Sequence, residues 1–593
     1  MASVAPTLGP VSDLAINTAL QRAKERRWKS LITKLLRVWQ HMQLSYYGGK
    51  YSIHRVLALD EYCRNTSLSR VLLVCLATPL PMVALIFGQE LIPLQELSEG
   101  WSASYGMWIR VAVLVGIVTH ALLIQATYLI DDFRITMSQR LQLYAIMSAI
   151  VVALAMVVAS NFVFPIPFFI LFVTPPFYLL LIVMLRVVIG SNDYRQMLKN
   201  RVQVVRCVRF VCAQTSTVFI FPVYEMLFNA AEGTEYQLPV ILLLPVIKVA
   251  LKNLVLYFAK ALDDMAPVEV IFTADFFNAI YVATSIKSST SIAAISAITI
   301  TDLSQTFIML YGLQRRTATI LSRLGQASDN PTSTDTVLSI MSGFCRNPEV
   351  LQKEAHTGIR RRSCLPHQIS AIDKSLLDSL DQTLGVESLT KSPVIQPDPN
   401  NSSSPFRENN SSMNCLRRIC VRSHVNGIYP IVHNSEMESY TRTTSKDSNI
   451  LLESLQILFT TECLVTTAYL EAFMPLFYSS YMVLMVHLPN VRYHLEMAKV
   501  TRENIVSTVL PLVVFGLLQI VSFALLVVVI KRNCRMKPLY QLAFVLETQW
   551  SLVQCKMMLW MVITLCFRVT HFGVDFKFEF IRLGLPRFWV PQG

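Results

Sequence analysis

Residues 504–530 read NIVSTVLPLVVFGLLQIVSFALLVVVI, and this stretch contains no charged side chain. A helix needs about 20 predominantly apolar residues to cross the hydrocarbon core of a bilayer. A transmembrane β-strand would need about ten residues of alternating polarity, and the apolar residues of this run do not alternate. The run therefore predicts a membrane-spanning α-helix.

Similar runs recur along the chain in two blocks. We predict about eleven spans, the others lying at 71–91, 107–130, 141–163, 166–186, 208–229, 237–259, 266–286, 290–312, 453–487 and 543–567. The runs 266–286 and 543–567 carry internal charge, and 453–487 is too long for one crossing. The predicted fold is an all-α, polytopic helical membrane protein with about 10–11 transmembrane helices.

The composition agrees with a membrane protein. The 593 residues are 53% hydrophobic and 15% charged, whereas soluble domains are usually about 45–50% apolar and about 25% charged. The net charge of +13 gathers at the ends of apolar runs and near the N-terminus, which favours lipid contact over nucleic acid. The expected segments are a basic N-terminal part, a first transmembrane block, a linker, a second block and a tail: 1–70, 71–312, 313–449, 450–570 and 571–593.

Lysine and arginine in the short loops set the expected orientation, because cytoplasmic loops are enriched in them. Basic and non-basic loops alternate through the first block, as crossings from a cytoplasmic N-terminus require. Arg315 and Arg316 then place the linker in the cytoplasm as well. The basic tail after 543–567 would lie outside, so a ten-crossing version with the tail inside stays open. We expect an integral membrane protein and favour the plasma membrane.

The N-terminal segment is expected to form a basic amphipathic helix from Asp13 to about Met42. Such a helix typically lies on an anionic leaflet, which makes the bilayer surface its expected partner. A solvated helix, or one packed on the loops, is the alternative. The proposed membrane-surface patch consists of Arg22, Lys24, Arg26, Arg27 and Lys29.

The linker is rich in Ser, Asn, Pro and charge, which predicts disorder over most of its length. One short amphipathic helix is expected on the cytoplasmic face, because apolar residues repeat there at helical spacing: Ile369, Ile372, Leu376, Leu380 and Leu384. Three arginines, 360–362, precede Ser363, a pattern typical of sites for basophilic kinases. Ser363 is therefore a candidate phosphorylation site.

Ionisable residues inside the apolar runs are the most informative functional signal, because they usually face a cavity or a partner. Lys248 and Lys252 lie four residues apart and hence on one face of the sixth span. We expect them to face Asp275 and Asp302, and we add Glu462 of the ninth span to the same hypothetical substrate or ion pathway. A structural network that fixes helix register is the alternative.

Proline is a second signal, since interior prolines free a backbone carbonyl and broken helices recur at transporter sites. Pro239 and Pro245 coincide with the two lysines of the sixth span, which makes that span the most interesting. The motifs of common enzymes are missing, and the ten histidines show no metal-ligand spacing. We therefore expect no enzymatic activity, no metal and no cofactor.

The stretch Phe272-Thr273-Ala274-Asp275-Phe276-Phe277-Asn278-Ala279 is joined later by Thr461-Glu462-Cys463 and Tyr469-Leu470-Glu471. These motifs resemble those of an uncharacterised family of multi-pass transmembrane proteins from oomycetes. The resemblance covers most of the two membrane blocks and not the linker. It implies a membrane location and says nothing about a substrate.

The leading hypothesis from the sequence is a secondary transporter-like protein with a polar intramembrane site for a small molecule or ion. It depends on the number of spans, the prolines and the buried charges. The alternative is a membrane receptor or scaffold that signals through the cytoplasmic linker. An intramembrane enzyme ranks third, because no paired catalytic residues support it.

Overall fold

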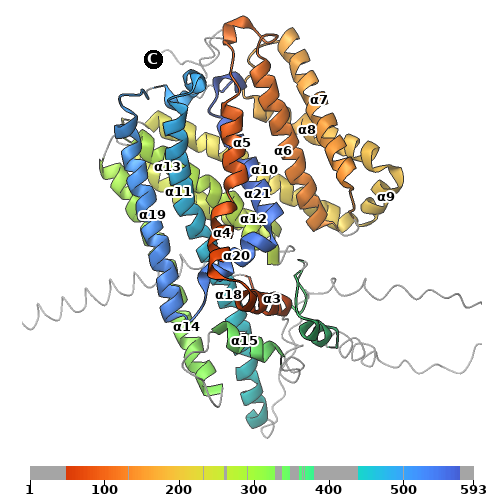
Figure 1. Cartoon of the computed structure of the whole chain (residues 1–593), viewed down its shortest axis with the longest axis vertical. Coiled ribbons are helices and arrows are strands. Elements are labelled where there is room, and N and C mark those ends of the chain that lie inside the picture. The colour runs from red at the N-terminus through yellow and green to blue at the C-terminus, as the bar shows by residue number, and fades with distance from the viewer. Residues whose placement is uncertain are drawn as a thin grey trace, which may run out of the picture.

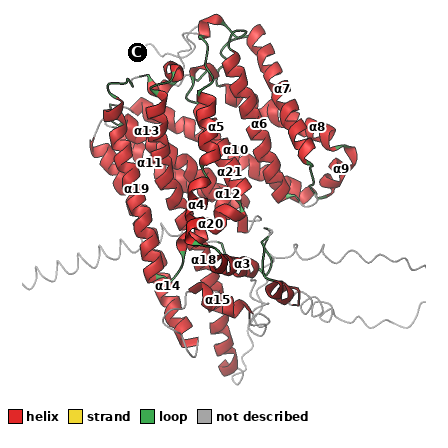
Figure 2. Cartoon of the chain, in the orientation of Figure 1, coloured by secondary structure: helices red, strands yellow, loops and turns green. Residues whose placement is uncertain are grey.

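The computed structural model describes residues 49–574, apart from 131–132, 232, 235, 260–263, 290–291, 328–336, 347–359, 364, 366, 380–437 and 499. Within this part of the chain every regular element is helical (Figure 2). Ten of these helices are long and apolar enough to cross a membrane. The expected polytopic all-α fold is confirmed. The basic patch Arg22–Lys29, Leu380, Leu384 and the tail beyond 574 lie outside the described residues.

The first block contains eight of the ten spans. Two short helices form the first span, and three consecutive segments form the seventh. In chain order the elements are α4 (Leu68–Ala77) with α5 (Leu80–Glu90), α6 (Tyr105–Leu129), α7 (Met137–Asn161), α8 (Phe169–Ile189), α10 (Arg201–Ala231), α11 (Gln237–Ala259), then α12 (Ala266–Val270), the π-helical η3 (Ile271–Asp275) and α13 (Phe276–Ser288), and finally α14 (Ile292–Ala327).

The second block contains the long α18, α19 and a pair of shorter helices. Smaller helices lie at the ends of the bundle. The second block comprises α18 (Glu438–Met485), α19 (Ile505–Asn533), α20 (Pro538–Thr548) and α21 (Trp550–Cys566), and the smaller helices are α3 (Ile53–Asn65), η1 (Leu97–Glu99), α9 (Ser191–Lys199), α15 (Val337–Arg346), η4 (Pro489–Tyr493), η5 (Leu495–Met497) and η6 (Thr570–Phe572).

Local sequence sets where several helices begin. Ser52 and Ser67 cap α3 and α4 by accepting a hydrogen bond from a backbone N–H three residues on. Thr136 and Gln139 form a capping box at the start of α7. Proline stands in the first turn of α5, α12 and α20, where its missing N–H has no intrahelical partner to lose.

The last apolar run is divided at Gln549 but still crosses the bundle. Helix α20 packs on α3 and α4, whereas α21 packs on α5 and α6, so the pair runs alongside the first span (Figure 1). Beyond α21, the Arg568 carbonyl accepts from the Leu495 N–H at 2.9 Å, and His571 Nε2 contacts the Gln95 carbonyl at 2.8 Å. These loops follow the ninth and first spans, so the described chain ends opposite α3. The ten described helices that are long and apolar enough to cross a membrane do not include α20 or α21, so the ten-crossing and eleven-crossing versions both stay predictions.

We call the two ends of the bundle the α3 end and the Arg568 end. The α3 end also holds α15 and the described residues of 360–379, that is 360–363, 365 and 367–379, which we call the strap; residues 371–379 of it are helical. Helix α14 continues to Ala327, so the boundary predicted at 313 falls inside a helix. Of the apolar residues predicted to form the linker helix, Ile372 is exposed, while Leu377 faces inward instead.

Two spans form the centre of the bundle, and they are the least apolar. The seventh span and α18 have the lowest hydropathy of the ten, yet nearly every residue of their most apolar windows is buried inside the protein. Helices α10, α11, α18, α19 and α21 surround the seventh span. A helix enclosed by protein need not be apolar to be stable in a membrane, because neighbouring helices satisfy its polar groups. Polar chemistry is therefore concentrated in these two spans.

Candidate functional site

A cluster of buried charges lies where α11 meets the seventh span. Lys248 and Lys252 stand one turn apart on α11, and both point at Asp275. The Lys252 Nζ lies 2.7 Å from Asp275 Oδ2, and the Lys248 Nζ lies 3.6 Å from Oδ1. The Thr467 hydroxyl of α18 donates to Oδ2 at 3.0 Å. The expected meeting of both lysines with Asp275 is therefore present in the structure.

Glu471 of α18 is the fourth charged member of this cluster. Its Oε1 lies 2.7 Å from the Lys248 Nζ, closer than either oxygen of Asp275. Sequence reasoning left Glu471 out of the predicted site. Its position nine residues after Glu462 put the two carboxylates on opposite faces of one helix, but the spacing did not show which of the two faces the lysines.

Asp302 of α14 completes the set without touching either lysine. Its Oδ2 accepts a hydrogen bond from the Gln519 side chain of α19. It shares a small cavity with Lys248, so the two groups face the same space. We call Lys248, Lys252, Asp275, Asp302 and Glu471 the central cluster, and all five side chains are buried.

The π-helical turn η3 ends at Asp275. A π-turn inserts one extra residue into a helix and rotates the turns after it, and such turns often occur at functional sites. Here it interrupts the helix next to the central cluster. By contrast, α11 remains one continuous helix through Pro245. The prolines of the sixth span therefore leave its helix unbroken, and the irregular backbone lies in the seventh span.

Two small cavities lie on either side of Lys248. One reaches toward Tyr224 and Ser285 and includes Asp302, and the other includes Lys252 and Glu471. Each has a volume of about 20 Å³. A cavity needs about 10–15 Å³ to hold one water molecule. Each cavity is therefore large enough for a water molecule or a bare small cation.

Glu462 belongs to a different group, at the α3 end. Its carboxylate binds the Arg55 guanidinium at 2.7 and 2.8 Å and accepts a hydrogen bond from the Tyr51 hydroxyl. Among the described contacts, Glu462 therefore pairs with Arg55 and not with Lys248 or Lys252. The physical reason is the rotation of α18, which turns Glu462 toward α3 and Glu471 toward α11.

Asp264 lies beside this group and joins it to the strap. The Ser52 hydroxyl donates to Asp264 Oδ2 at 2.7 Å, and Arg360 of the strap lies 3.4 Å from Oδ1. Burial raises the pKa of Asp264, but the Arg55 and Arg360 guanidinium groups outweigh it and hold this pKa below its ordinary value. Ser363, the candidate phosphorylation site, is half-buried next to the same carboxylate.

The strap is held to α3 by main-chain and side-chain contacts. The first two N–H groups of α3, at Ile53 and His54, donate to the carbonyls of residues 360 and 361 at 3.0 and 2.9 Å. His367 stacks on Phe544 of α20 with the ring centroids 5.3 Å apart. Burial and the charge of Arg55 lower the pKa of His367 to about 3. The ring is therefore neutral while the strap is docked.

A third buried ion pair lies apart from the central cluster. Lys556 of α21 contacts Glu269 at 2.7 Å, and Gln214 of α10 donates to the same carboxylate at 2.7 Å. Gln125 of α6 in turn donates to Gln214 at 3.0 Å. This chain of polar groups joins α6, α10, α21 and the seventh span. The sequence showed Lys556 and Glu269 but not that they meet.

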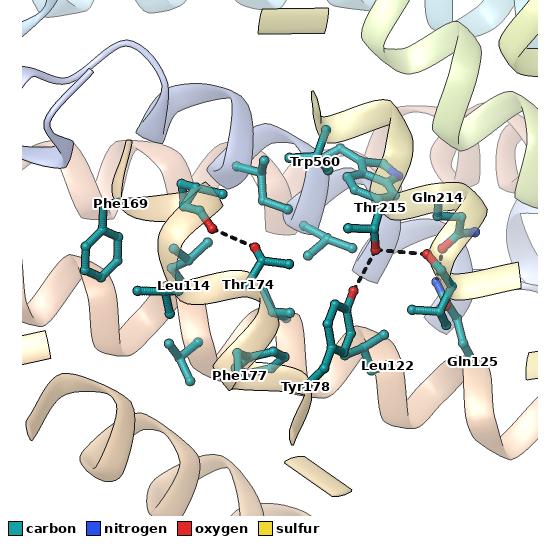
Figure 3. Close-up of a pocket in the computed structure, with 18 residues that line it drawn as sticks. Leu114, Leu122, Gln125, Phe169, Thr174, Phe177, Tyr178, Gln214, Thr215 and Trp560 are labelled. Carbon is teal, nitrogen blue, oxygen red and sulfur yellow. Dashed lines mark hydrogen bonds between the residues drawn. The ribbon is translucent and has the colours of Figure 1, made fainter. Parts of the chain in front are cut away.

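Next to this pair lies a cavity of about 90 Å³ between α6, α8, α10 and α21 (Figure 3). Its wall is mainly aliphatic and aromatic. Tyr178 of α8 points across to Thr215 of α10, and their hydroxyls are 2.7 Å apart. Sites for small organic molecules usually measure about 300–1,000 Å³. This cavity therefore has room for a short apolar group only.

Among the described residues, no group of three or more His, Cys, Asp or Glu side chains could hold a metal ion. Comparisons with protein-family models, with curated proteins and with solved structures returned no match. The resemblance to the oomycete family stays a prediction. Function must therefore be argued from the chemistry of this chain.

Proposed function

We propose that this protein is a secondary transporter-like membrane protein whose central cluster binds and releases a proton or another small cation. The observation that carries the proposal is the charge balance of the cluster. Three carboxylates, Asp275, Asp302 and Glu471, face only two lysines, 248 and 252. An uncompensated buried charge is costly, so the cluster is most stable when it takes up one positive charge.

The positions of the groups point to Asp302 as the exchangeable member. Asp275 and Glu471 each lie 2.7 Å from a lysine nitrogen, whereas Asp302 contacts the neutral side chain of Gln519. A carboxylate without a direct cationic partner gains most from a proton or a cation. The water-sized cavities next to Lys248 favour a small cargo over an organic molecule.

The test is flux through the full-length protein in proteoliposomes that contain a pH-sensitive dye. Cation gradients would be applied one at a time, with protons, Na⁺ and K⁺ as the first panel. We expect Asp302→Asn and Lys248→Met to lower flux by about tenfold or more, since each removes a charged hydrogen-bonding group. Glu99→Gln, which alters an exposed carboxylate at the end of the short helix η1, is the matched control and should leave flux unchanged.

Two results would contradict the proposal in different ways. If the wild-type protein moved no cation faster than protein-free vesicles, the transport function would be wrong. If the wild type did transport but Asp302→Asn and Lys248→Met behaved like Glu99→Gln, the function would stand and the site would be wrong.

A receptor or scaffold is the second candidate, and the docked strap favours it. The strap belongs to the linker, yet it caps α3 and touches α20. In this function, Ser363 would be phosphorylated on the cytoplasmic side, which is also where we place the N-terminal patch on an anionic leaflet. Ser363→Ala distinguishes the candidates: transport should survive this substitution, whereas signalling that depends on phosphorylation of Ser363 should not.

A further inference from the structure

The two ends of the bundle carry matching groups of three residues. At the α3 end, Arg55 pairs with Glu462 at 2.7 Å, its guanidinium lies over the Tyr51 ring, and the Tyr51 hydroxyl donates to Glu462. We call this set the α3-end lock.

At the opposite end, Arg568 pairs with Glu496 at 2.8 Å. Its guanidinium lies over the Tyr478 ring, and the Tyr478 hydroxyl donates to Glu496. Arg568 also donates to the Thr284 hydroxyl of the seventh span at 2.7 Å. We call Arg568, Glu496 and Tyr478 the Arg568-end lock. It has the same composition and the same three contacts as the α3-end lock.

Helix α18 links the two locks through the central cluster. Along this one helix, Glu462 belongs to the first lock, Glu471 to the central cluster and Tyr478 to the second lock. At 1.5 Å per residue, Glu471 lies about 13 Å from Glu462 and about 10 Å from Tyr478 along the axis. The seventh span is shared in the same way, since it supplies Asp275 to the cluster and Thr284 to the second lock.

We infer that the two locks are the gates of the proposed pathway, and that opening one gate connects the central cluster to one side of the membrane. This inference rests on the proposed function, which requires access to the cluster from both sides in turn. In the structure both locks are formed, so the described conformation is closed at both ends.

The chemistry of the locks suits two discrete states. Arg55 and Glu462 are fully buried, Arg568 is almost so, and the Glu496 side chain is 12% exposed. A charged side chain is stable when it is paired or when it is hydrated, and it is unstable when it has neither a partner nor water around it. A lock is therefore either closed and dry, or open and wet. Tyrosine adds a hydrogen bond and a cation–π contact that only the closed state contains.

Two thiols report the opening of each end separately in the full-length chain. Cys463 is buried directly after Glu462, within electrostatic reach of Lys252 and Arg55, so it lies between the α3-end lock and the cluster. Ser285 lines the cavity on the other side of Lys248, and Ser285→Cys places a second thiol there. Cys555 of α21 is buried away from both locks and reports general loosening.

The experiment measures how fast N-ethylmaleimide labels each thiol, resolved by residue with mass spectrometry, in proteoliposomes. Glu462→Gln is compared with Glu496→Gln, because each removes one lock carboxylate and keeps its shape. We expect Glu462→Gln to raise labelling of Cys463 by about tenfold, equivalent to about 1.4 kcal/mol, without raising labelling of the thiol from Ser285→Cys. Glu496→Gln should do the reverse, and Cys555 should stay protected in both variants.

If a glutamine variant does not fold, Tyr51→Phe and Tyr478→Phe remove only one hydroxyl from each lock and should give the same asymmetry at smaller size. Labelling that rises at all three thiols together, or at none, would overturn the gating inference. The readout does not need flux. Asymmetric labelling together with an inactive wild type would support the gating inference and contradict the proposed transport of a small cation. Active transport together with symmetric labelling would support the transport function and contradict the gating inference.

Discussion

Replacing Asp275 with asparagine tests whether the central cluster is a true ion-pair network. Asp275 contacts Lys252 at 2.7 Å, Lys248 at 3.6 Å and the Thr467 hydroxyl at 3.0 Å. Asparagine keeps the shape but removes the negative charge that both lysines face. Breaking a buried pair on one side costs about 3–5 kcal/mol, because a charge stays buried without compensation. We expect Asp275→Asn to lower the free energy of unfolding by that amount.

The complementary change, Lys252→Met, should cost less. Asp275 then keeps Lys248 and Thr467, so the loss should be about 1–3 kcal/mol, as for an unsatisfied buried group. The double variant removes both partners. We expect it to be more stable than the sum of the two single changes implies, by about 1–3 kcal/mol.

The assay is unfolding in mixed detergent micelles, followed by tryptophan fluorescence, for the wild type, both single variants and the double variant. Glu99→Gln serves as the control and should stay within about 0.5 kcal/mol of the wild type. If the effects of Asp275→Asn and Lys252→Met added to within about 0.5 kcal/mol, the two side chains would not interact, and the network on which the proposed site depends would be refuted.

Three further predictions concern packing and the strap. In Gly106→Ala the new Cβ would overlap the Pro93 carbonyl oxygen, so we expect a loss of about 1–3 kcal/mol in the same unfolding assay, whereas Gly88→Ala, with open space around it, should cost nothing. The pKa of His367 is about 3 in the docked strap and about 6.5 when the side chain is free, so docking should be fully stable above about pH 6.5 and should weaken by about 2 kcal/mol by about pH 5. Hydrogen exchange of the strap should therefore rise on acidification. His367→Phe keeps the stacking on Phe544 and should abolish that rise. Ser363→Glu should free the strap at neutral pH, because it adds negative charge beside a buried carboxylate, and Ser363→Ala should not; equal exchange in both variants would contradict the role of this site.

Much of the architecture was predictable from local sequence. Whether a segment can span a bilayer depends on its own length and apolar content, so runs such as 504–530 and 141–163 correspond to long helices in the structure. The run 266–286, doubtful because of its charges, became the central helix. The internal charges that made this span an uncertain prediction also agree with its central position, because charges are tolerated where other helices surround a span.

Helix packing decides which charged side chains pair with one another, and the two glutamates of α18 show why. The sequence by itself determined that Glu462 and Glu471 lie nine residues apart on opposite faces of one helix, and that Lys248 and Lys252 share a face of another. Only the tertiary structure decided that Glu471 meets Lys248 while Glu462 meets Arg55. The physical reason is that helical periodicity fixes the angle between two side chains on one helix. The rotation of that helix toward its neighbours is set by packing against all of them at once.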